Sequence, residues 1–130
     1  IKEKKKFPNI KFIYSEARNA IRQSMKLNLS SMIKLDVKLN NNVLNIKSSK
    51  NTFGPQPFLA IKTNKEEYFH DNLDFQTPFR EWTYTFDEQT LILDNVDSIG
   101  IGCCDNSGNV EVVVIESPGK INEKILRNNY

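Results

Sequence analysis

The sequence predicts a mainly β fold, an antiparallel β-sandwich preceded by one short helix. Apolar and polar residues alternate with a period of two over much of residues 33–115, which is the pattern of strands with one buried face. Turns rich in Asn, Gly and Pro separate seven or eight such segments at short intervals, which is typical of a sandwich or a small barrel. A length of 130 residues suits one domain.

The expected organisation is a basic leader with a short helix over 1–32, the β-sandwich domain over 33–116 and a C-terminal tail over 117–130. Apolar residues recur at steps of three and four between Ala17 and Met25, which is the spacing of one helix face. Ser15 is a residue type that caps helix N-termini, and Glu16 suits the positive end of the helix dipole. The sequence therefore predicts a helix over residues 15–25.

The first strand is expected from Ile33 to Leu39, where apolar residues alternate with lysine and aspartate. Three asparagines at 40–42 turn the chain into a second strand that begins at Val43. After a loop over 48–56, a third strand is expected from Phe58 to Ile61. Its uninterrupted apolar character indicates burial on both faces.

The segment from Thr63 to Thr77 is polar and aromatic, and its structure is not predicted. Residues 80–86 form a strong strand signal, because aromatic and β-branched residues alternate with polar ones. Later strands are predicted at 91–93, at 99–103 and, after a turn over 105–109, at 110–115. Residues 121–126 are expected to form a short helix in the tail.

The formal net charge of +2 is too small to indicate a nucleic-acid partner. Lysines are nevertheless frequent in the first 65 residues, whereas Asp and Glu concentrate between Glu66 and Glu88. Two explanations stay open: solvated strand faces with a solubilising arm, or a basic surface that meets anionic lipid or an acidic partner. The longest apolar runs have four residues, far short of the roughly 20 that span a bilayer. No transmembrane segment is therefore expected in this fragment.

The two cysteines, Cys103 and Cys104, are adjacent in the sequence. Neighbouring side chains of a strand point to opposite faces, so a disulfide between them is not expected. Two free thiols suit a reducing compartment, which favours an intracellular location. Nothing else in the sequence predicts a cellular location.

The sequence contains no set of residues that could run a catalytic cycle, so the chain is not expected to be an enzyme. His70 is the only histidine, and it is interpreted as a loop residue without a special role. A four-ligand zinc site cannot be assembled from one histidine and a cysteine pair on opposite faces. Asp105, next to the cysteines, would raise the pKa of a neighbouring thiol and so oppose a nucleophilic role. No cofactor and no metal are expected.

Three segments together resemble a C2 domain, an eight-stranded sandwich that docks on membranes. Residues 56–61 look like the family's Asp-Pro-Tyr-Val-Lys-Val strand, and residues 78–86 are similar to its Pro-x-Trp-x-Glu-x-Phe-x-Phe strand. Residues 99–105 match the strand that ends in a Val-Tyr-Asp run, and Ile33 to Leu39 would be the opening strand. The resemblance covers residues 33–116.

The resemblance implies a non-enzymatic, calcium-independent module for contact with an anionic membrane or with a protein. Calcium requires six to eight oxygen ligands, but the loop over 48–55 has no acidic residue, and Gln56 replaces the family's aspartate. In the family, a lysine-rich strand surface commonly meets phosphoinositide headgroups. The corresponding lysines here are Lys47, Lys50, Lys62 and Lys65. Each lysine near an anionic surface would contribute about 1 kcal/mol.

A second reading stays open, an α+β fold in which a helix packs on an antiparallel sheet. The helix with Ala17, Arg18 and Ala20, the strand at 112–115 and the segment at 118–121 are similar to minor pilin-like subunits of filaments or secretion assemblies. In those subunits a membrane-spanning apolar segment normally precedes the helix. Lysines occupy that region here, at positions 2 and 4–6.

Overall fold

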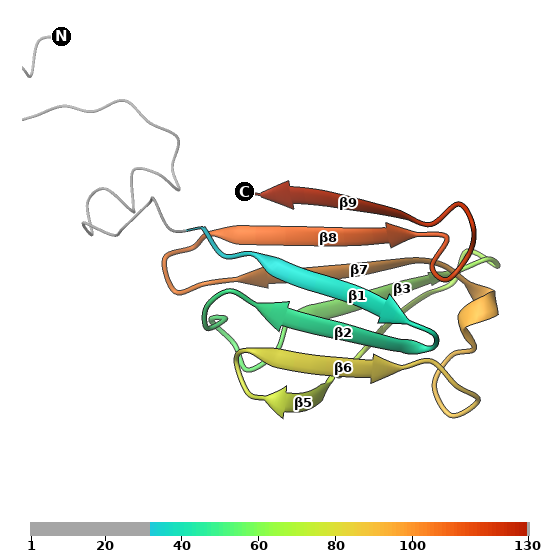
Figure 1. Cartoon of the computed structure of the whole chain (residues 1–130), viewed down its shortest axis with the longest axis horizontal. Helices are drawn as coiled ribbons and strands as arrows, with labels where there is room; N and C mark the ends of the chain where they lie inside the picture. Colours follow the sequence, from blue (N-terminus) through green and yellow to red (C-terminus); the bar gives the residue numbers. More distant parts are fainter. Residues whose placement is uncertain (1–31, 130) are drawn as a thin grey trace, which may run out of the picture.

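The computed structural model describes residues 32–129, which form two facing antiparallel sheets (Figure 1). The predicted helix over 15–25 lies outside these residues. The four-stranded sheet has the order β1-β2-β6-β5, and the five-stranded sheet has the order β4-β3-β7-β8-β9. The strands are β1 (Leu35–Asn40), β2 (Val43–Ser48), β3 (Phe58–Thr63), β4 (Tyr68–Asp71), β5 (Asp74–Thr77), β6 (Glu81–Thr85), β7 (Val96–Cys104), β8 (Val110–Glu116) and β9 (Lys124–Asn129). The predicted mainly β, sandwich-like architecture is confirmed.

Alternating apolar side chains of both sheets fill the space between them. Trp82 in the four-stranded sheet is 1% exposed, and its indole N–H donates a hydrogen bond of 2.9 Å to the carbonyl oxygen of Pro55. Ile61, Ile99 and Ile115 bring fully buried side chains from three strands of the other sheet. This pattern follows the period of two in the sequence, because successive side chains of a strand point to opposite faces.

The third strand differs from its prediction. Leu59 and Ile61 are buried as expected, but Phe58 is 64% exposed on the outer face of the five-stranded sheet. The prediction that both faces of this strand are buried is therefore wrong. An uninterrupted apolar run does not show whether a second layer covers the outer face, and within residues 32–129 none does.

Two local predictions near the end of the chain are also wrong. The segment 91–93 leads into a 3₁₀ turn, η1 (Leu93–Asn95), from which Leu91 and Leu93 pack against the core without pairing as a strand. The expected tail helix over 121–126 is replaced by β9, which pairs with the available edge of β8. Strand pairing overrode the expected helix at 121–126, whereas 91–93 has no strand partner and so forms no strand. Within residues 32–129 no helix is long and apolar enough to cross a membrane.

Candidate functional site

Several connections meet at one end of the sandwich, hereafter the loop end. It consists of the start of β1, the β2–β3 loop over 49–57, the β5–β6 turn over 78–80, the β7–β8 turn over 105–109 and the last residues of β9. Backbone hydrogen bonds hold these parts together. Thr52 N–H donates to Phe79 O over 3.1 Å, and Phe53 N–H donates to Cys104 O over 2.8 Å. The β2–β3 loop is thus fixed to both sheets.

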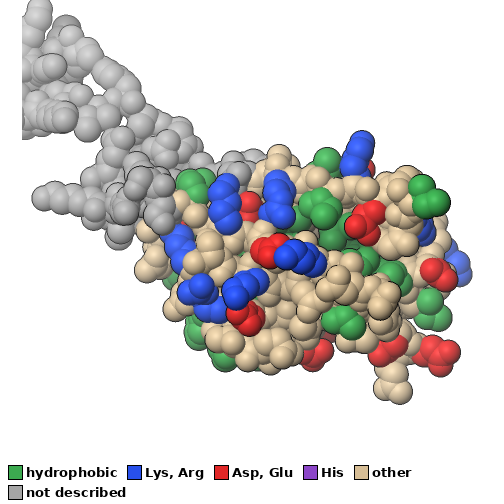
Figure 2. Space-filling view, viewed as in Figure 1, with side chains coloured by type: hydrophobic (Ala, Val, Ile, Leu, Met, Phe, Trp, Pro, Cys, Tyr) green, Lys and Arg blue, Asp and Glu red, His purple; other side chains and the backbone are tan. Residues whose placement is uncertain are grey.

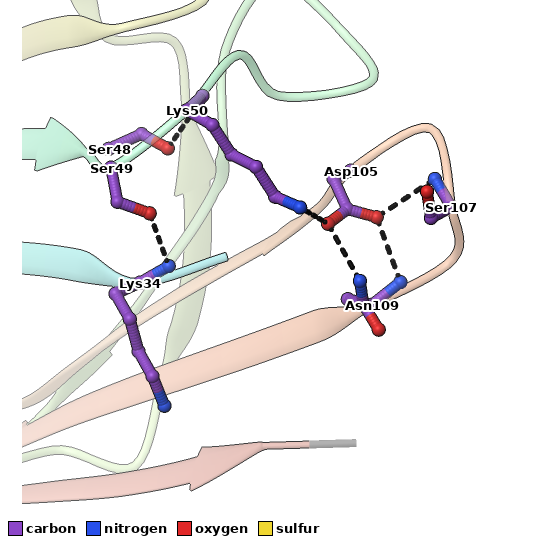
Figure 3. Close-up of polar contacts among 7 residues, drawn as sticks. All are labelled: Lys34, Ser48, Ser49, Lys50, Asp105, Ser107 and Asn109. Atoms are coloured by element: carbon purple, nitrogen blue, oxygen red, sulfur yellow. Dashed lines mark hydrogen bonds and ion pairs between the residues drawn. The ribbon is translucent and has the colours of Figure 1, made fainter. Parts of the chain in front are cut away.

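A buried ion pair lies at the centre of the loop end (Figure 3). Lys50 extends from the β2–β3 loop to Asp105 at the start of the β7–β8 turn, and its Nζ lies 2.7 Å from a carboxylate oxygen. Asp105 is 2% exposed. Its carboxylate also accepts hydrogen bonds from the backbone N–H of Ser107 over 2.9 Å, and from the backbone N–H and side-chain amide of Asn109 over 3.0 and 2.9 Å.

Burial alone would raise the pKa of Asp105, but hydrogen bonds from Lys50, Asn109 and Ser107 outweigh burial and lower it below its ordinary value. The carboxylate is therefore ionised at neutral pH. The lysine ammonium occupies one side of it and backbone amides occupy the other. Among residues 32–129 no group of three His, Cys, Asp or Glu side chains is arranged to hold a metal ion.

A second buried carboxylate joins the two sheets at the start of β1. Glu111 on β8 is 1% exposed, and its Oε2 accepts the backbone N–H of Leu35. Its Oε1 lies 4.0 Å from Lys34 Nζ and 4.0 Å from Arg127 Nη1. Arg127, which reaches across from β9, also donates to the carbonyl oxygen of Leu35. Side chains of one sheet thus complete the backbone hydrogen bonding of an edge strand in the other.

A shallow groove of about 330 Å³ opens beside this network and is called the basic groove here. Its lining residues are Lys34, Leu35, Asp36, Lys47, Ser48, Ser49, Arg80 and Arg127. Figure 2 shows Lys and Arg side chains gathered on this part of the surface, over the start of β1 and the ends of β2 and β9. The groove is therefore suited to anionic groups.

Acidic groups lie next to the cations of the basic groove and reduce its positive electrostatic potential. Lys47 lies 2.9 Å from Glu81, and Lys38, just outside the groove, lies 3.2 Å from Asp36. Together with Lys34, Arg80 and Arg127, these lysines make five cations against the three carboxylates of Asp36, Glu81 and Glu111. Five minus three leaves an excess of two positive charges, so electrostatic attraction alone would be weak and sensitive to salt.

Large aromatic side chains project from the same end. Phe53 in the β2–β3 loop is 72% exposed, and Phe79 in the β5–β6 turn is 39% exposed. Phe79 has a φ of 68°, a left-handed conformation that costs a non-glycine residue about 1–3 kcal/mol. Its N–H donates to Pro55 O over 3.1 Å, which holds the strained turn in place. Phe53 and Phe79 line one hollow of the loop end, and Arg80, which follows Phe79 in the sequence, lines the basic groove. The loop end therefore carries both exposed aromatic side chains and cations.

A different cavity, of about 690 Å³, lies between the β4–β5 connection and the end of β6. Its lining includes Asp71, Asp74 and Asp87, so it would repel the anions that the groove attracts. Tyr84 donates a hydrogen bond of 2.9 Å to Asp71. Burial and this carboxylate raise the pKa of Tyr84 to about 12, so the phenol remains a proton donor at neutral pH. We assign no function to this cavity.

The structure separates the lysines predicted as a lipid-binding patch. Lys47 points outward from the four-stranded sheet, and Lys50 is paired with Asp105 at the loop end. Lys62 points outward from the five-stranded sheet, on the opposite side of the sandwich, where its Nζ lies 3.6 Å from Asp97. Lys65 is exposed in the β3–β4 turn beyond it. Two lysines therefore lie at or near the loop end, and two lie elsewhere.

Five residues of the loop end were not predicted as site residues from the sequence: Lys34, Arg80, Arg127, Phe53 and Phe79. Lys34 directly precedes β1, and Arg80 directly precedes β6. Such a position indicates that a residue lies at one end of a strand, but it does not show which strand ends lie close together in the fold. Arg127 was not selected because it follows residues 121–126, which were expected to form a short helix in the tail. The two phenylalanines stand in turns, where a large apolar side chain is a sequence-level sign of an exposed anchor.

The cysteines behave as their alternation predicts. Cys103 is buried, Cys104 is partly exposed, and both are free thiols. Burial raises the pKa of Cys103 to about 12, and the neighbouring Glu111 adds to the shift. A thiol with so high a pKa is protonated and unreactive at neutral pH. His70 is on β4 instead of in a loop, and its ring stacks on Phe58 with centroids 6.1 Å apart.

No protein-family model matches the chain, and no curated protein or solved structure is significantly similar to it.

Proposed function

We propose that this chain is a non-enzymatic docking module that binds anionic membrane surfaces through its loop end, without calcium. The observation that carries the proposal is the pairing of exposed Phe53 and Phe79 with the basic groove at one end of a rigid sandwich. Aromatic side chains gain free energy by entering the interfacial layer, and cations gain it from anionic headgroups. The loop end offers both.

The expected affinity is modest. Two excess positive charges would contribute about 2 kcal/mol at an anionic surface. Phe53 has most of its side chain available for burial and Phe79 has less, so together they would add about 3 kcal/mol. A total of about 5 kcal/mol corresponds to a dissociation constant of a few tenths of a millimolar. The module would therefore bind reversibly and would depend on salt.

The ion pair at the loop end supports independence from calcium. A calcium site in these loops would need Asp105 and several further oxygen ligands. Lys50 instead places an ammonium 2.7 Å from that carboxylate, and this cation neutralises it. The lysine thus neutralises the carboxylate that a bound calcium ion would otherwise neutralise.

The two facing sheets also support the C2-like reading. The segments that resemble the family form β3, β6 and β7, and the loop end includes the connections that follow β2 and β7. A pilin-like subunit would instead pack its helix on one antiparallel sheet. Here the core of residues 32–129 is filled by side chains from both sheets, so the arrangement favours the sandwich.

Vesicle sedimentation tests the proposal. We expect the chain to bind phosphatidylcholine vesicles that contain phosphatidylserine or a phosphoinositide at low salt, in the presence of a calcium chelator, and not to bind phosphatidylcholine alone. Phe53→Ser combined with Phe79→Asn should weaken binding roughly a hundredfold, because the apolar anchors and their contribution of about 3 kcal/mol are lost. Asparagine is chosen because it tolerates the left-handed conformation at residue 79.

The chain offers a matched control for charge. Lys47→Gln with Arg80→Gln removes two cations from the basic groove, whereas Lys62→Gln with Lys65→Gln removes two from the β3 side. Only the first pair should weaken binding. If only the second pair does so, the docking surface is the β3 side and not the loop end. Absence of binding to any anionic vesicle at low salt would refute membrane docking altogether.

A further inference from the structure

Among residues 32–129, β1 is an edge strand, as are β4, β5 and β9. Within residues 32–129 the only strand neighbour of β1 is β2, and Figure 1 shows β8 and β9 beyond its other edge. A two-residue turn joins β1 to β2, and its closing pair is Asn40 with Val43. The closing pair of such a turn is hydrogen-bonded, and bonded pairs alternate along an antiparallel ladder. Leu35, Val37 and Leu39 therefore direct their N–H and C=O groups away from β2.

The contacts of Leu35 agree with this alternation. Its N–H is accepted by Glu111 and its C=O receives Arg127, both from the five-stranded sheet. Those side chains provide the hydrogen bonds that a neighbouring strand would otherwise supply. Further along β1, no described residue outside the β1–β2 ladder is hydrogen-bonded to the backbone of Val37 or Leu39. Within residues 32–129, the edge is therefore closed at one end and open over these two residues.

The five-stranded sheet extends past this edge. Ile125 on β9 pairs with Ile115 and so faces the same side, toward the other sheet. Ile115 is 0% exposed and lies on β8, against which β1 packs, whereas Ile125 on β9 is 45% exposed. Arg127, two residues further along β9, contacts the start of β1. Neighbouring strands of a sheet are about 4.8 Å apart, so a strand added beside β1 would lie on the β9 side of the sandwich. The sandwich has four strands facing five at this edge.

We propose that the open edge of β1 accepts one extended segment of a partner protein, in which apolar and acidic side chains alternate. Its backbone would pair with Val37 and Leu39, as in other cases of strand addition at a sheet edge. Its apolar side chains would face inward and cover Ile125. Its acidic side chains would face the solvent side, where Lys38 is 68% exposed. This interaction is separate from membrane docking.

The charges beside β1 indicate which kind of segment would pair with its edge. Lys34, Lys38 and Arg127 flank the edge, and the carboxylates of Asp36 and Glu111 offset two of these three charges, so an excess of one positive charge favours an acidic segment over a basic one. A second copy of the chain does not fit the place. Pairing β1 with β1 of another copy would bring that copy's β8, which lies against its own β1, into the space that β9 occupies. A single strand meets no such obstacle.

A synthetic peptide of alternating valine and glutamate, titrated into the full chain and followed by amide NMR, tests this proposal. We expect shift changes concentrated in β1 and β9, and slower hydrogen exchange for the N–H groups of Val37 and Leu39 on binding. A peptide of alternating valine and lysine is the matched probe and should bind more weakly. Shift changes at another edge, or equal binding of both peptides, would overturn the proposal.

Two variants locate the contact. Val37→Pro removes an N–H that faces the open edge and leaves the β1–β2 ladder intact, so binding should weaken about tenfold. Ile125→Asp places a charge where the peptide's apolar side chains would lie, and should weaken binding without unfolding a half-exposed position. Thermal unfolding of both variants verifies the fold. If Val37 and Leu39 are already protected from exchange in the free chain, the edge is occupied by the chain itself and the proposal is wrong.

Discussion

Replacing Asp105 with alanine should lower the free energy of unfolding by about 3 kcal/mol. The substitution removes the carboxylate that lies 2.7 Å from Lys50 Nζ, and this lysine side chain is only 31% exposed. It also removes the acceptor for the backbone N–H of Asn109, a residue that is fully buried. Both losses occur at the point where the β2–β3 loop meets the β7–β8 turn. Urea unfolding followed by tryptophan fluorescence measures the change.

A surface ion pair on the same protein provides the control. Asp97 is 50% exposed and lies 3.6 Å from Lys62, so Asp97→Ala should change stability by only about 0.5 kcal/mol. Lys50→Met should destabilise less than Asp105→Ala, because the carboxylate keeps its bonds to Ser107 and Asn109. Equal effects of Asp105→Ala and Asp97→Ala would show that the buried pair does not stabilise the loop end.

The stabilisation by Asp105 should also depend on pH. The pKa of Asp105 is lower in the folded chain than in the unfolded one, so the unfolded state binds the proton more readily. Its contribution is therefore complete above about pH 4, near the unfolded pKa, and is lost as the pH falls through the folded pKa. The stability difference between the native chain and Asp105→Asn should be constant above that value and shrink below it. A difference that grows in acid would contradict this sign.

Replacing Glu111 with alanine should cost about 3 kcal/mol for a different reason. Glu111 accepts the N–H of Leu35 and is the shared acidic neighbour of Lys34 and Arg127, at 4.0 Å from each. Without it, the start of β1 loses its attachment to β8, and two cations face each other beside a small cavity. Hydrogen exchange should then accelerate at Leu35 more than at Val113, which lies in the middle of β8.

Glutamine at position 111 separates the two roles of this side chain. Glu111→Gln keeps an oxygen that can accept the N–H of Leu35 but removes the charge, so about 1 kcal/mol should be lost. Glu116→Ala, at the exposed end of the same strand, should have little effect. If Glu111→Gln were as damaging as Glu111→Ala, attraction to the cations would dominate and the hydrogen bond to β1 would matter little.

Most strands could be predicted from the sequence, because the alternation that identifies them is local. The segment from Ile33 to Leu39 and the aromatic segment at 80–86 were predicted on this basis, and they became β1 and β6. The failures occurred where a neighbour decides the outcome. Residues 121–126 contribute to a strand because β8 has an edge free for pairing, and residues 91–93 do not because no partner strand is beside them.

The candidate site was predictable only in part. The absence of acidic residues from the loop over 48–55 could be read directly, and Lys50 was among the selected lysines. The partner of Lys50 could not be identified, since Asp105 belongs to a turn far away in the sequence. Nor could the sequence show that Lys62 and Lys47 point to opposite sides of the sandwich, because that depends on which sheet each strand joins.

Composition and the two-residue rhythm by themselves determined a mainly β chain with one buried face per strand, a modest positive charge and two unpaired thiols. Tertiary structure alone decided which cations line the basic groove, which of them have acidic neighbours, and which strands lie at the sheet edges. The physical reason is distance. The alternation that predicts strands is visible in residues that are adjacent in the chain. Ion pairs and strand pairs, in contrast, form over a few ångströms between segments that only the folded sandwich brings together.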